Sequence, residues 1–379
     1  MSETTVDCTA RRIAEHAAVH ELAEVEVILH GGEPLLAGPD FISYAVRVIR
    51  TEVADVGTRV RVSIQTNGLR LDEAFLRLFE HLEIRVGVSL DGDEQAQDRH
   101  RRFFNGKGSH TAVSASLRRL ASGPFHHLFS GLLCTIDIRN DPLATYEALL
   151  AFDPPAIDFL LPHGNWVTPP PFRDPDSSAT PYADWLIPIF DRWYGSPSQE
   201  TEIRFFTEIM RLLLGQDSRT ETVGLSPVRM AVIETDGSIE QSDILKSSYP
   251  GAAATRMHIL RDSFDAVLRH PAIVARQIGS VRSHRCAVAA TSSPSAAGAC
   301  TPIVTAPPGL PGTVGLLPRP PPAHHAHPRE STPRHQPSEG EPMKLIPRQV
   351  SDKTFTELAA GGEGPRRSKN CEPGSGSRP

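Results

Sequence analysis

Val25-Glu26-Val27-Ile28-Leu29-His30-Gly31-Gly32-Glu33-Pro34-Leu35-Leu36 is the stretch that decides the fold of this chain. It is a short apolar run, rich in β-branched residues, that stops at a charged glycine turn, which is typical of a buried strand. The two glycines let the backbone pass close to a ligand. A carboxylate at the carboxyl end of a parallel strand lies where α/β barrels place their chemistry, so Glu33 suits a cationic amine.

The order of strand, polar turn and helix recurs along the chain. A second strand is predicted to end at Gln65-Thr66-Asn67-Gly68, and a third, over residues 84–90, to end at Asp91-Gly92. Apolar periodicity predicts further strands over 128–136 and 157–161, and helices over 5–22, 39–53, 72–82, 113–120, 143–152, 182–193 and 202–214. This alternation predicts an α/β fold with a parallel sheet, helices outside and polar residues at its carboxyl edge.

Two of the predicted helices have a definable apolar face. In the first helix the face is Ile13, Ala17 and residues 20–22, and in the second it is Phe41, Tyr44, Ala45, Val48, Ile49 and Val53. After the barrel pattern, residues 228–243 are predicted to form a hairpin with its turn at Asp236-Gly237, and residues 263–278 are predicted to form a last helix. From about Cys286 the chain is rich in proline and loses its periodicity, which predicts a disordered tail with one short helix over 350–360.

Composition narrows the class of protein. The chain has 379 residues, 39% of them hydrophobic, and a formal charge of −6, which argues against a nucleic-acid partner. It has no apolar run of about 18 residues and no signal peptide, so we expect a cytoplasmic protein without a membrane partner. The five cysteines are scattered without a Cys-x2-Cys pair, so no metal site is predicted from them: Cys8, Cys134, Cys286, Cys300 and Cys371.

The ordered set of turn motifs resembles a known family. His30-Gly31-Gly32-Glu33-Pro34-Leu35, Gln65-Thr66-Asn67-Gly68, Ser89-Leu90-Asp91-Gly92 and Asp98-Arg99-His100-Arg101 are similar to those of radical S-adenosylmethionine (SAM) enzymes that carry a SPASM domain. Leu161-Pro162-His163-Gly164-Asn165-Trp166 and Glu234-Thr235-Asp236-Gly237-Ser238 resemble the branch of FxsB-type peptide maturases. The resemblance implies a partial (β/α)6 TIM-type barrel, SAM as cofactor with a [4Fe-4S] cluster, and a ribosomally made precursor peptide as partner.

The resemblance also assigns roles to single residues. It implies that Gly31, Gly32 and Glu33 hold the methionine amine of SAM, and that Gln65, Asn67 and Ser89 line its ribose and carboxylate. It further implies that Arg101 pairs with the carboxylate and that Asp91 supports this last turn. The domains expected from it are a partial barrel over 1–170, the remainder of the barrel and a SPASM-like α+β region over 171–285, and the disordered tail over 286–379.

The chain departs from the family in its cysteines. The family holds its cluster with a Cys-x3-Cys-x2-Cys loop after the first barrel strand, and neither that loop nor that strand is found, so we expect an N-terminally truncated barrel without a first strand. The codons of residues 286–306 permit a SPASM cysteine signature in another frame, so we expect the tail to be frameshifted. Residues that could catalyse a reaction therefore stay unassigned.

Two other classes of function are alternatives to a radical SAM enzyme. His30-Gly31-Gly32 is similar to the oxyanion turn of lipases, but the sequence has no Gly-x-Ser-x-Gly elbow, which argues against an esterase. The other alternative is a catalytically inactive barrel that binds SAM or a peptide.

Overall fold

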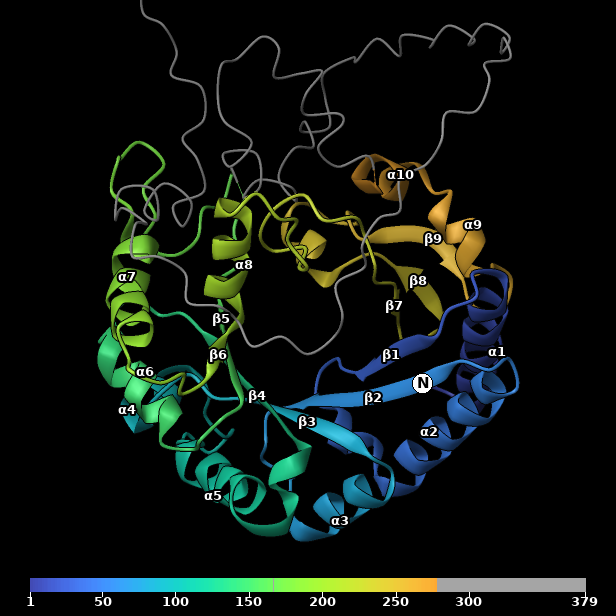
Figure 1. Ribbon diagram of the computed structural model, residues 1–379, viewed down its shortest axis with the longest axis horizontal. Helices are drawn as coiled ribbons and strands as arrows, with labels where there is room; N and C mark the ends of the chain where they lie inside the picture. The colour runs from blue at the N-terminus through green and yellow to red at the C-terminus, as the bar shows by residue number, and fades with distance from the viewer. Residues whose placement is uncertain (166, 278–379) are drawn as a thin grey trace, which may run out of the picture.

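The computed structural model describes residues 1–165 and 167–277, and its larger part is a curved parallel sheet with helices around its outside (Figure 1). The six strands are hydrogen-bonded in chain order: β1 (Glu24–Leu29), β2 (Arg59–Thr66), β3 (Ile84–Ser89), β4 (Phe129–Thr135), β5 (Ala156–Leu160) and β6 (Glu202–Ile203). All five neighbouring pairs are parallel. The predicted partial barrel is therefore confirmed, and it has a sixth strand, β6, that the sequence pattern missed.

The helices of this part follow the strands as the alternation predicted. They are α1 (Glu3–Val19), α2 (Pro39–Ala54), α3 (Glu73–His81), α4 (Glu94–His100), α5 (His110–Ala121), α6 (Pro142–Leu150), α7 (Pro181–Tyr194) and α8 (Arg204–Leu213). Asp72 caps α3 by accepting a hydrogen bond from the backbone N–H of Phe75. Helix α4 was not predicted, because its sequence Glu-Gln-Ala-Gln-Asp-Arg-His has no apolar periodicity.

Alternation along the strands separates the two faces of the sheet. On β2, Val62 and Ile64 are buried under the outer helices, whereas Ser63 and Gln65, between and beyond them, are partly buried and belong to the opposite, concave face. On β3, the same alternation assigns Ser89 to the concave face. The main hydrophobic core consequently lies between the sheet and its helices, and the polar residues of β2 and β3 lie on the concave face.

β1 was predicted as a buried strand, and this is wrong. It is an edge strand, hydrogen-bonded to β2 on one side, and within the described residues no strand pairs with its other side. Val25, Val27 and Leu29 pack against the core, but Ile28 remains 51% exposed. The strand is half-buried because helices cover one of its faces while the other faces the open side of the sheet.

The predicted apolar faces of the first two helices need correction. Of the residues predicted for α1 only Ala17 is buried, and the buried face is instead formed by Thr5, Val6, Ala10, Ala14 and Ala17. In α2 the buried residues are Ile42, Ala45, Val46, Ile49 and Val53. The two helices pack on each other, and the alanines of α1 let the branched side chains of α2 approach closely.

The C-terminal part of the described chain is a small α+β unit with a hydrophobic core of its own. The predicted hairpin is present as β7 (Val232–Ile233) and β8 (Ser238–Glu240), and β9 (Ala254–His258) adds a third antiparallel strand. The single helix predicted over 263–278 is two helices, α9 (Phe264–Leu268) and α10 (Pro271–Gln277). Proline lacks an N–H and starts a helix more readily than it continues one, so Pro271 begins the second.

Several sequence predictions lie outside the described residues. They are the disordered tail over 286–379 with its frameshift, the short helix over 350–360, and the positions of Trp166, Cys286, Cys300 and Cys371. The domain boundaries at 170 and 285 stay predictions. No helix among residues 1–165 and 167–277 is long and apolar enough to cross a membrane.

Candidate functional site

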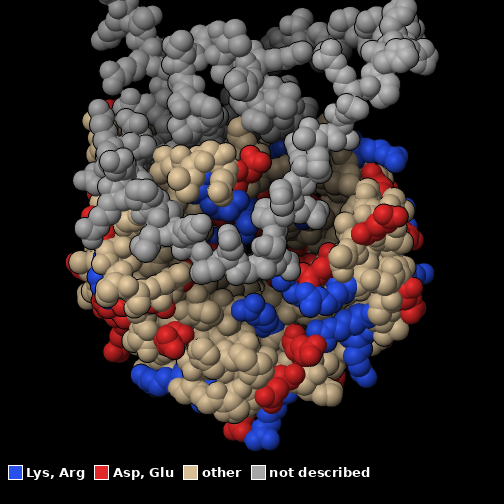
Figure 2. Space-filling model, in the orientation of Figure 1, with Lys and Arg blue, Asp and Glu red and all other residues tan. Residues whose placement is uncertain are grey.

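The concave face of the sheet carries charged side chains that pair with one another on neighbouring strands. Glu24 of β1 accepts bonds from the guanidinium groups of Arg59 and Arg61 on β2, the latter at 2.7 Å from Nε to Oε1. At the far end of the sheet, Arg204 pairs with Asp158 of β5. Figure 2 shows acidic and basic side chains next to one another over β1 and β2. Charged pairs thus lie on this face, opposite the apolar face that packs under the helices.

Gln65 and Ser89 meet on the concave face near the carboxyl ends of β2 and β3. The side-chain amide of Gln65 donates a hydrogen bond from Nε2 to Ser89 Oγ at 3.1 Å. Gln65 pairs with Gly87 in the sheet, and a Cβ at Gly87 would lie 2.3 Å from Gln65 Oε1. Glycine at position 87 therefore leaves the space that lets the Gln65 amide lie across β3.

The loop after β1 exposes its backbone at Gly31 and Gly32. Both residues have a positive φ, 92° and 29°, which side chains other than glycine rarely adopt. Apart from their chain neighbours, no residue has an atom within 4 Å of where a side chain would begin at either glycine, so the space beside both Cα atoms is open. A ligand can approach this backbone closely.

Glu33 is already hydrogen-bonded within the protein. Its Oε1 accepts bonds from the Leu35 N–H at 3.0 Å and the Thr66 hydroxyl at 2.7 Å, and its Oε2 accepts from the Asn67 N–H at 2.8 Å. The side-chain oxygen of Asn67 accepts in turn from the Leu69 N–H at 2.9 Å. The carboxylate thus fastens the glycine loop of β1 to the end of β2, a role that the sequence did not indicate.

Arg101 and Asp91 form the third pair at this edge. Arg101 donates from Nε to Asp91 Oδ2 at 2.6 Å and from Nη2 to Oδ1 at 3.2 Å, and Asp91 also accepts from the Thr135 N–H at 3.0 Å. The Asp91 N–H donates to the buried amide of Gln97, at 2.9 Å. Helix α4, which carries Gln97 and has Arg101 as its C-cap residue, therefore positions the guanidinium.

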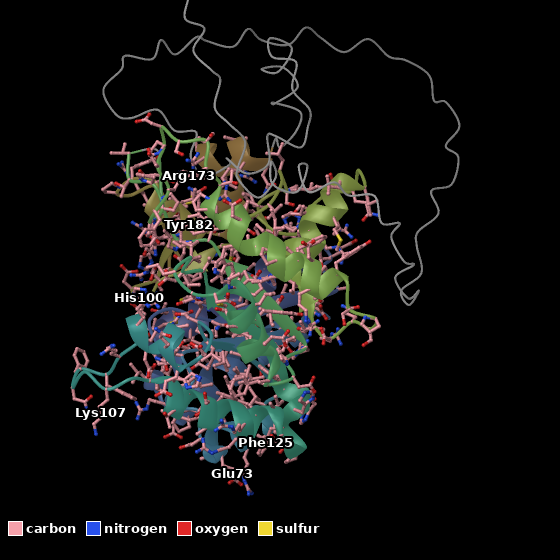
Figure 3. The ribbon with its side chains drawn as sticks, turned by 90° about the vertical axis from the view of Figure 1, so that its left-hand side faces the viewer. Glu73, His100, Lys107, Phe125, Arg173 and Tyr182 are labelled. Atoms are coloured by element: carbon pink, nitrogen blue, oxygen red, sulfur yellow. The ribbon has the colours of Figure 1, made fainter. Side chains whose placement is uncertain are left out.

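A cluster around Asp137 lies next to this pair and was not among the predicted site residues. The carboxylate contacts Arg99 Nη1 at 3.2 Å, His100 Nε2 at 3.1 Å and Arg139 Nη2 at 2.6 Å, and the Arg139 guanidinium holds its pKa well below the usual range. Figure 3, in which the left-hand side of Figure 1 faces the viewer, labels His100. The signal in the sequence was Asp137 at a strand end, but without α4 nothing placed Arg99 and His100 beside it.

The segment before α7 lies over the Asp137 cluster. The Arg139 guanidinium stacks on the Phe172 ring, with 5.3 Å from Cζ to the ring centroid. Tyr182 of α7 donates its hydroxyl to the Pro171 carbonyl at 2.7 Å, and its pKa is raised by burial and then by the charge of Asp137. Figure 3 shows Tyr182 and Arg173 on the same side as His100. This segment therefore borders the candidate site.

The two motifs of the predicted FxsB branch occupy structural positions. Asn165 donates from Nδ2 to the Ser247 carbonyl at 2.7 Å, which joins the end of the barrel to the C-terminal unit. Asp236 lies in the turn between β7 and β8, where hydrogen bonds from the Ser238 N–H and hydroxyl lower its pKa. Neither contact reaches the concave edge with Gln65.

Comparison with known proteins gives a match over the part of the chain that carries the candidate site. Residues 9–141 match the family model described as Radical SAM superfamily. A cysteine-type anaerobic sulfatase-maturating enzyme of Clostridium novyi (strain NT) is 26% identical over 218 residues, 56% of this chain and 57% of that protein. A serine-type anaerobic sulfatase-maturating enzyme of Klebsiella aerogenes is 32% identical over 130 residues, 34% of this chain and 31% of that protein. The chain thus matches less than two thirds of the length of either relative.

Solved structures share the fold. The structure described as "Native anSMEcpe with bound AdoMet and Cp18Cys peptide" matches with a TM-score of 0.61 at 19% identity, over 73% of this chain and 75% of that one. "Native anSMEcpe with bound AdoMet" matches with a TM-score of 0.59, also at 19% identity, over 73% of each chain.

Proposed function

We propose that this chain binds SAM at the carboxyl edge of its concave face, as a radical SAM/SPASM protein of the FxsB type that acts on a ribosomally made peptide. One observation carries the proposal: Gln65 with Ser89, Glu33 with Asn67, and Arg101 with Asp91 meet as three polar pairs at the edge where α/β barrels bind their ligands. The match of residues 9–141 to the radical SAM superfamily supports it.

The chemistry of the three pairs fits the parts of SAM. Gln65 and Ser89 offer an amide and a hydroxyl, which suit the ribose hydroxyls. A carboxylate has about four lone-pair sites, of which Glu33 uses three, so one remains for the methionine amine beside Gly31 and Gly32. Arg101 has five N–H donors, and those beyond its two bonds to Asp91 suit the SAM carboxylate.

An iron–sulfur cluster does not fit the described residues. The cluster of radical SAM enzymes supplies the electron that cleaves SAM, and it needs several neighbouring thiolates. The described cysteines are Cys8 and Cys134, which belong to separate hydrophobic cores. Burial raises the pKa of the Cys134 thiol, which disfavours the thiolate. The described residues therefore offer no set of thiolates that could hold such a cluster.

This mismatch favours a second candidate, a catalytically inactive barrel that binds SAM or a peptide. The two candidates share the SAM site and differ in whether the chain can cleave SAM. Anaerobic reconstitution of the purified chain with iron and sulfide separates them. The inactive barrel predicts no broad visible absorbance and no cleavage product, whereas a brown protein that cleaves SAM would support the enzyme.

Calorimetric titration with SAM tests the shared site. Gln65→Ala removes a neutral hydrogen bond and should weaken binding about 2- to 13-fold, and Arg101→Ala removes a charged one and should weaken it about 13- to 150-fold. Glu80→Ala, on the exposed side of α3, is the control and should bind as the wild type does. Melting temperatures confirm that each variant is folded. If Gln65→Ala and Arg101→Ala bind SAM like the control, the three pairs are only structural.

A further inference from the structure

Helix α1 presents to the C-terminal unit a row of residues spaced four apart, which places them on one face of the helix. Cys8 packs against the small core of that unit, and Arg12 donates from Nε to the Ile259 carbonyl at 3.3 Å. His16 continues the row, His20 follows it as the C-cap residue of α1, and both contact Asp265 of α9. This face of α1 thus joins the barrel to the C-terminal unit, and it ends in two histidines and a carboxylate.

The two histidines converge on a single oxygen. His16 Nδ1 lies 2.9 Å and His20 Nε2 lies 2.7 Å from Asp265 Oδ1, and the imidazole centroids are 4.3 Å apart. One donor atom from each of the three side chains lies within 4.8 Å of the others. All three side chains keep contact with solvent, with exposed fractions of 25%, 42% and 29% for His16, His20 and Asp265. The cluster is therefore accessible to an ion.

This donor set has the chemistry of a transition-metal site. Histidines at i and i+4 on a helix are the spacing with which helical zinc sites present two imidazoles on one face. Imidazole suits Zn²⁺, Co²⁺ and Ni²⁺, and a carboxylate completes a three-ligand set with room for water. Zinc–ligand distances of about 2.1 Å imply about 3.4 Å between ligand atoms in a tetrahedral site. The N···O separations of 2.9 and 2.7 Å must therefore widen by about 0.5 and 0.7 Å.

A second cluster of potential metal ligands in the described part of the chain is already occupied by a lysine. Glu234, Glu240 and Asp243 also bring their oxygens together, but Lys246 Nζ lies among them at 2.5, 2.8 and 2.9 Å. These carboxylates raise the pKa of Lys246, so its ammonium group stays charged and occupies the position that a metal ion would take. At Asp265 the partners are imidazoles, which can give up a proton and coordinate a metal.

We propose that His16, His20 and Asp265 form a binding site for a divalent transition metal of the Zn²⁺ class, which fastens α1 of the barrel to α9 of the C-terminal unit. The metal joins residues 245 and 249 positions apart in the chain. Because the ligands lie on different elements, the site exists only in the folded protein, so the bound metal stabilises the docking of the two parts.

Metal titration of the full chain tests the proposal. The tail contains His324, His325 and His327, which could also bind a metal. Every protein used in the titration therefore carries the substitutions His324→Ala, His325→Ala and His327→Ala. After removal of metal with a chelator, Co²⁺ is added, its visible absorption is recorded, and Zn²⁺ is used to displace it. We expect one Zn²⁺ per chain and, at a hundredfold excess over Kd, a rise in Tm of roughly 5–11 °C.

Two variants locate the site, and one serves as the matched control. His20→Ala and Asp265→Asn should each weaken Zn²⁺ binding at least tenfold and remove the rise in Tm. His81→Ala, at the exposed end of α3, should leave both unchanged. The proposal is overturned if the tail-substituted protein binds no Zn²⁺, or if His20→Ala and Asp265→Asn bind it as tightly as His81→Ala does. In either case the cluster is only a pair of hydrogen bonds.

Discussion

Glu33 is expected to stabilise the fold, independently of any ligand. Its carboxylate accepts three hydrogen bonds, from the Leu35 N–H, the Thr66 hydroxyl and the Asn67 N–H. In Glu33→Gln the remaining oxygen can still accept the first two, but the new NH2 group faces the Asn67 N–H, and two donors cannot bond. Loss of one hydrogen bond to a charged acceptor costs roughly 1.5–3 kcal/mol.

The assay is thermal unfolding followed by circular dichroism. At about 2–4 °C per kcal/mol, Glu33→Gln should lower Tm by roughly 3–12 °C. Glu80→Gln makes the same chemical change on the exposed side of α3 and should stay within about 2 °C of the wild type. Thr66→Val, alone and combined with Glu33→Gln, completes a double-mutant cycle. Because the oxygen that accepts from Thr66 remains in Glu33→Gln, the two effects should add to within about 0.5 kcal/mol.

Equal melting temperatures for Glu33→Gln and Glu80→Gln would refute this reasoning. The glycine loop would then be held by other contacts, and the hydrogen bonds of Glu33 would contribute nothing to the free energy of unfolding. A coupling well above about 0.5 kcal/mol between Glu33→Gln and Thr66→Val would instead show that Glu33→Gln also disturbs the Thr66 bond.

Three further predictions concern the barrel. Gly131→Ala should lose about 2–5 kcal/mol of unfolding free energy in urea denaturation, because φ is 142° and the new Cβ would lie 2.5 Å from the Ala156 carbonyl; Gly57→Ala, with a positive φ and open space, should lose less. Tyr146→Phe should gain about 0.5–2 kcal/mol in the same assay, since among the described residues nothing bonds its buried hydroxyl, whose pKa burial raises to about 12; an equal or larger loss would mean that the hydroxyl is bonded. The pKa of Asp137 is lowered, so its stabilisation is present above the ordinary carboxyl pKa of 3.8 and is lost as pH falls below it; Asp137→Asn should flatten the acid limb of a plot of Tm against pH, and an unchanged limb would contradict this.

The sequence alone determined the order of the elements and the class of the fold. Apolar runs such as 60–66 and 84–90 alternate with helical periodicity, and Asp72 and the glycine turns mark where elements begin and end. These are local properties, because strand and helix periodicity and capping depend on neighbouring residues. The pattern failed at α4, which has no apolar repeat, and at β6, which has only two residues.

The tertiary structure decided how the candidate residues are used. The motifs identified Glu33, Asp91 and Arg101, but only the fold showed that Glu33 bonds the end of β2 and that Arg101 bonds Asp91. Likewise, His16 and His20 lie four apart in the sequence, whereas their carboxylate partner comes from residue 265. Contacts between residues so far apart depend on the packing of whole elements, and no local pattern encodes which side chains that packing brings together.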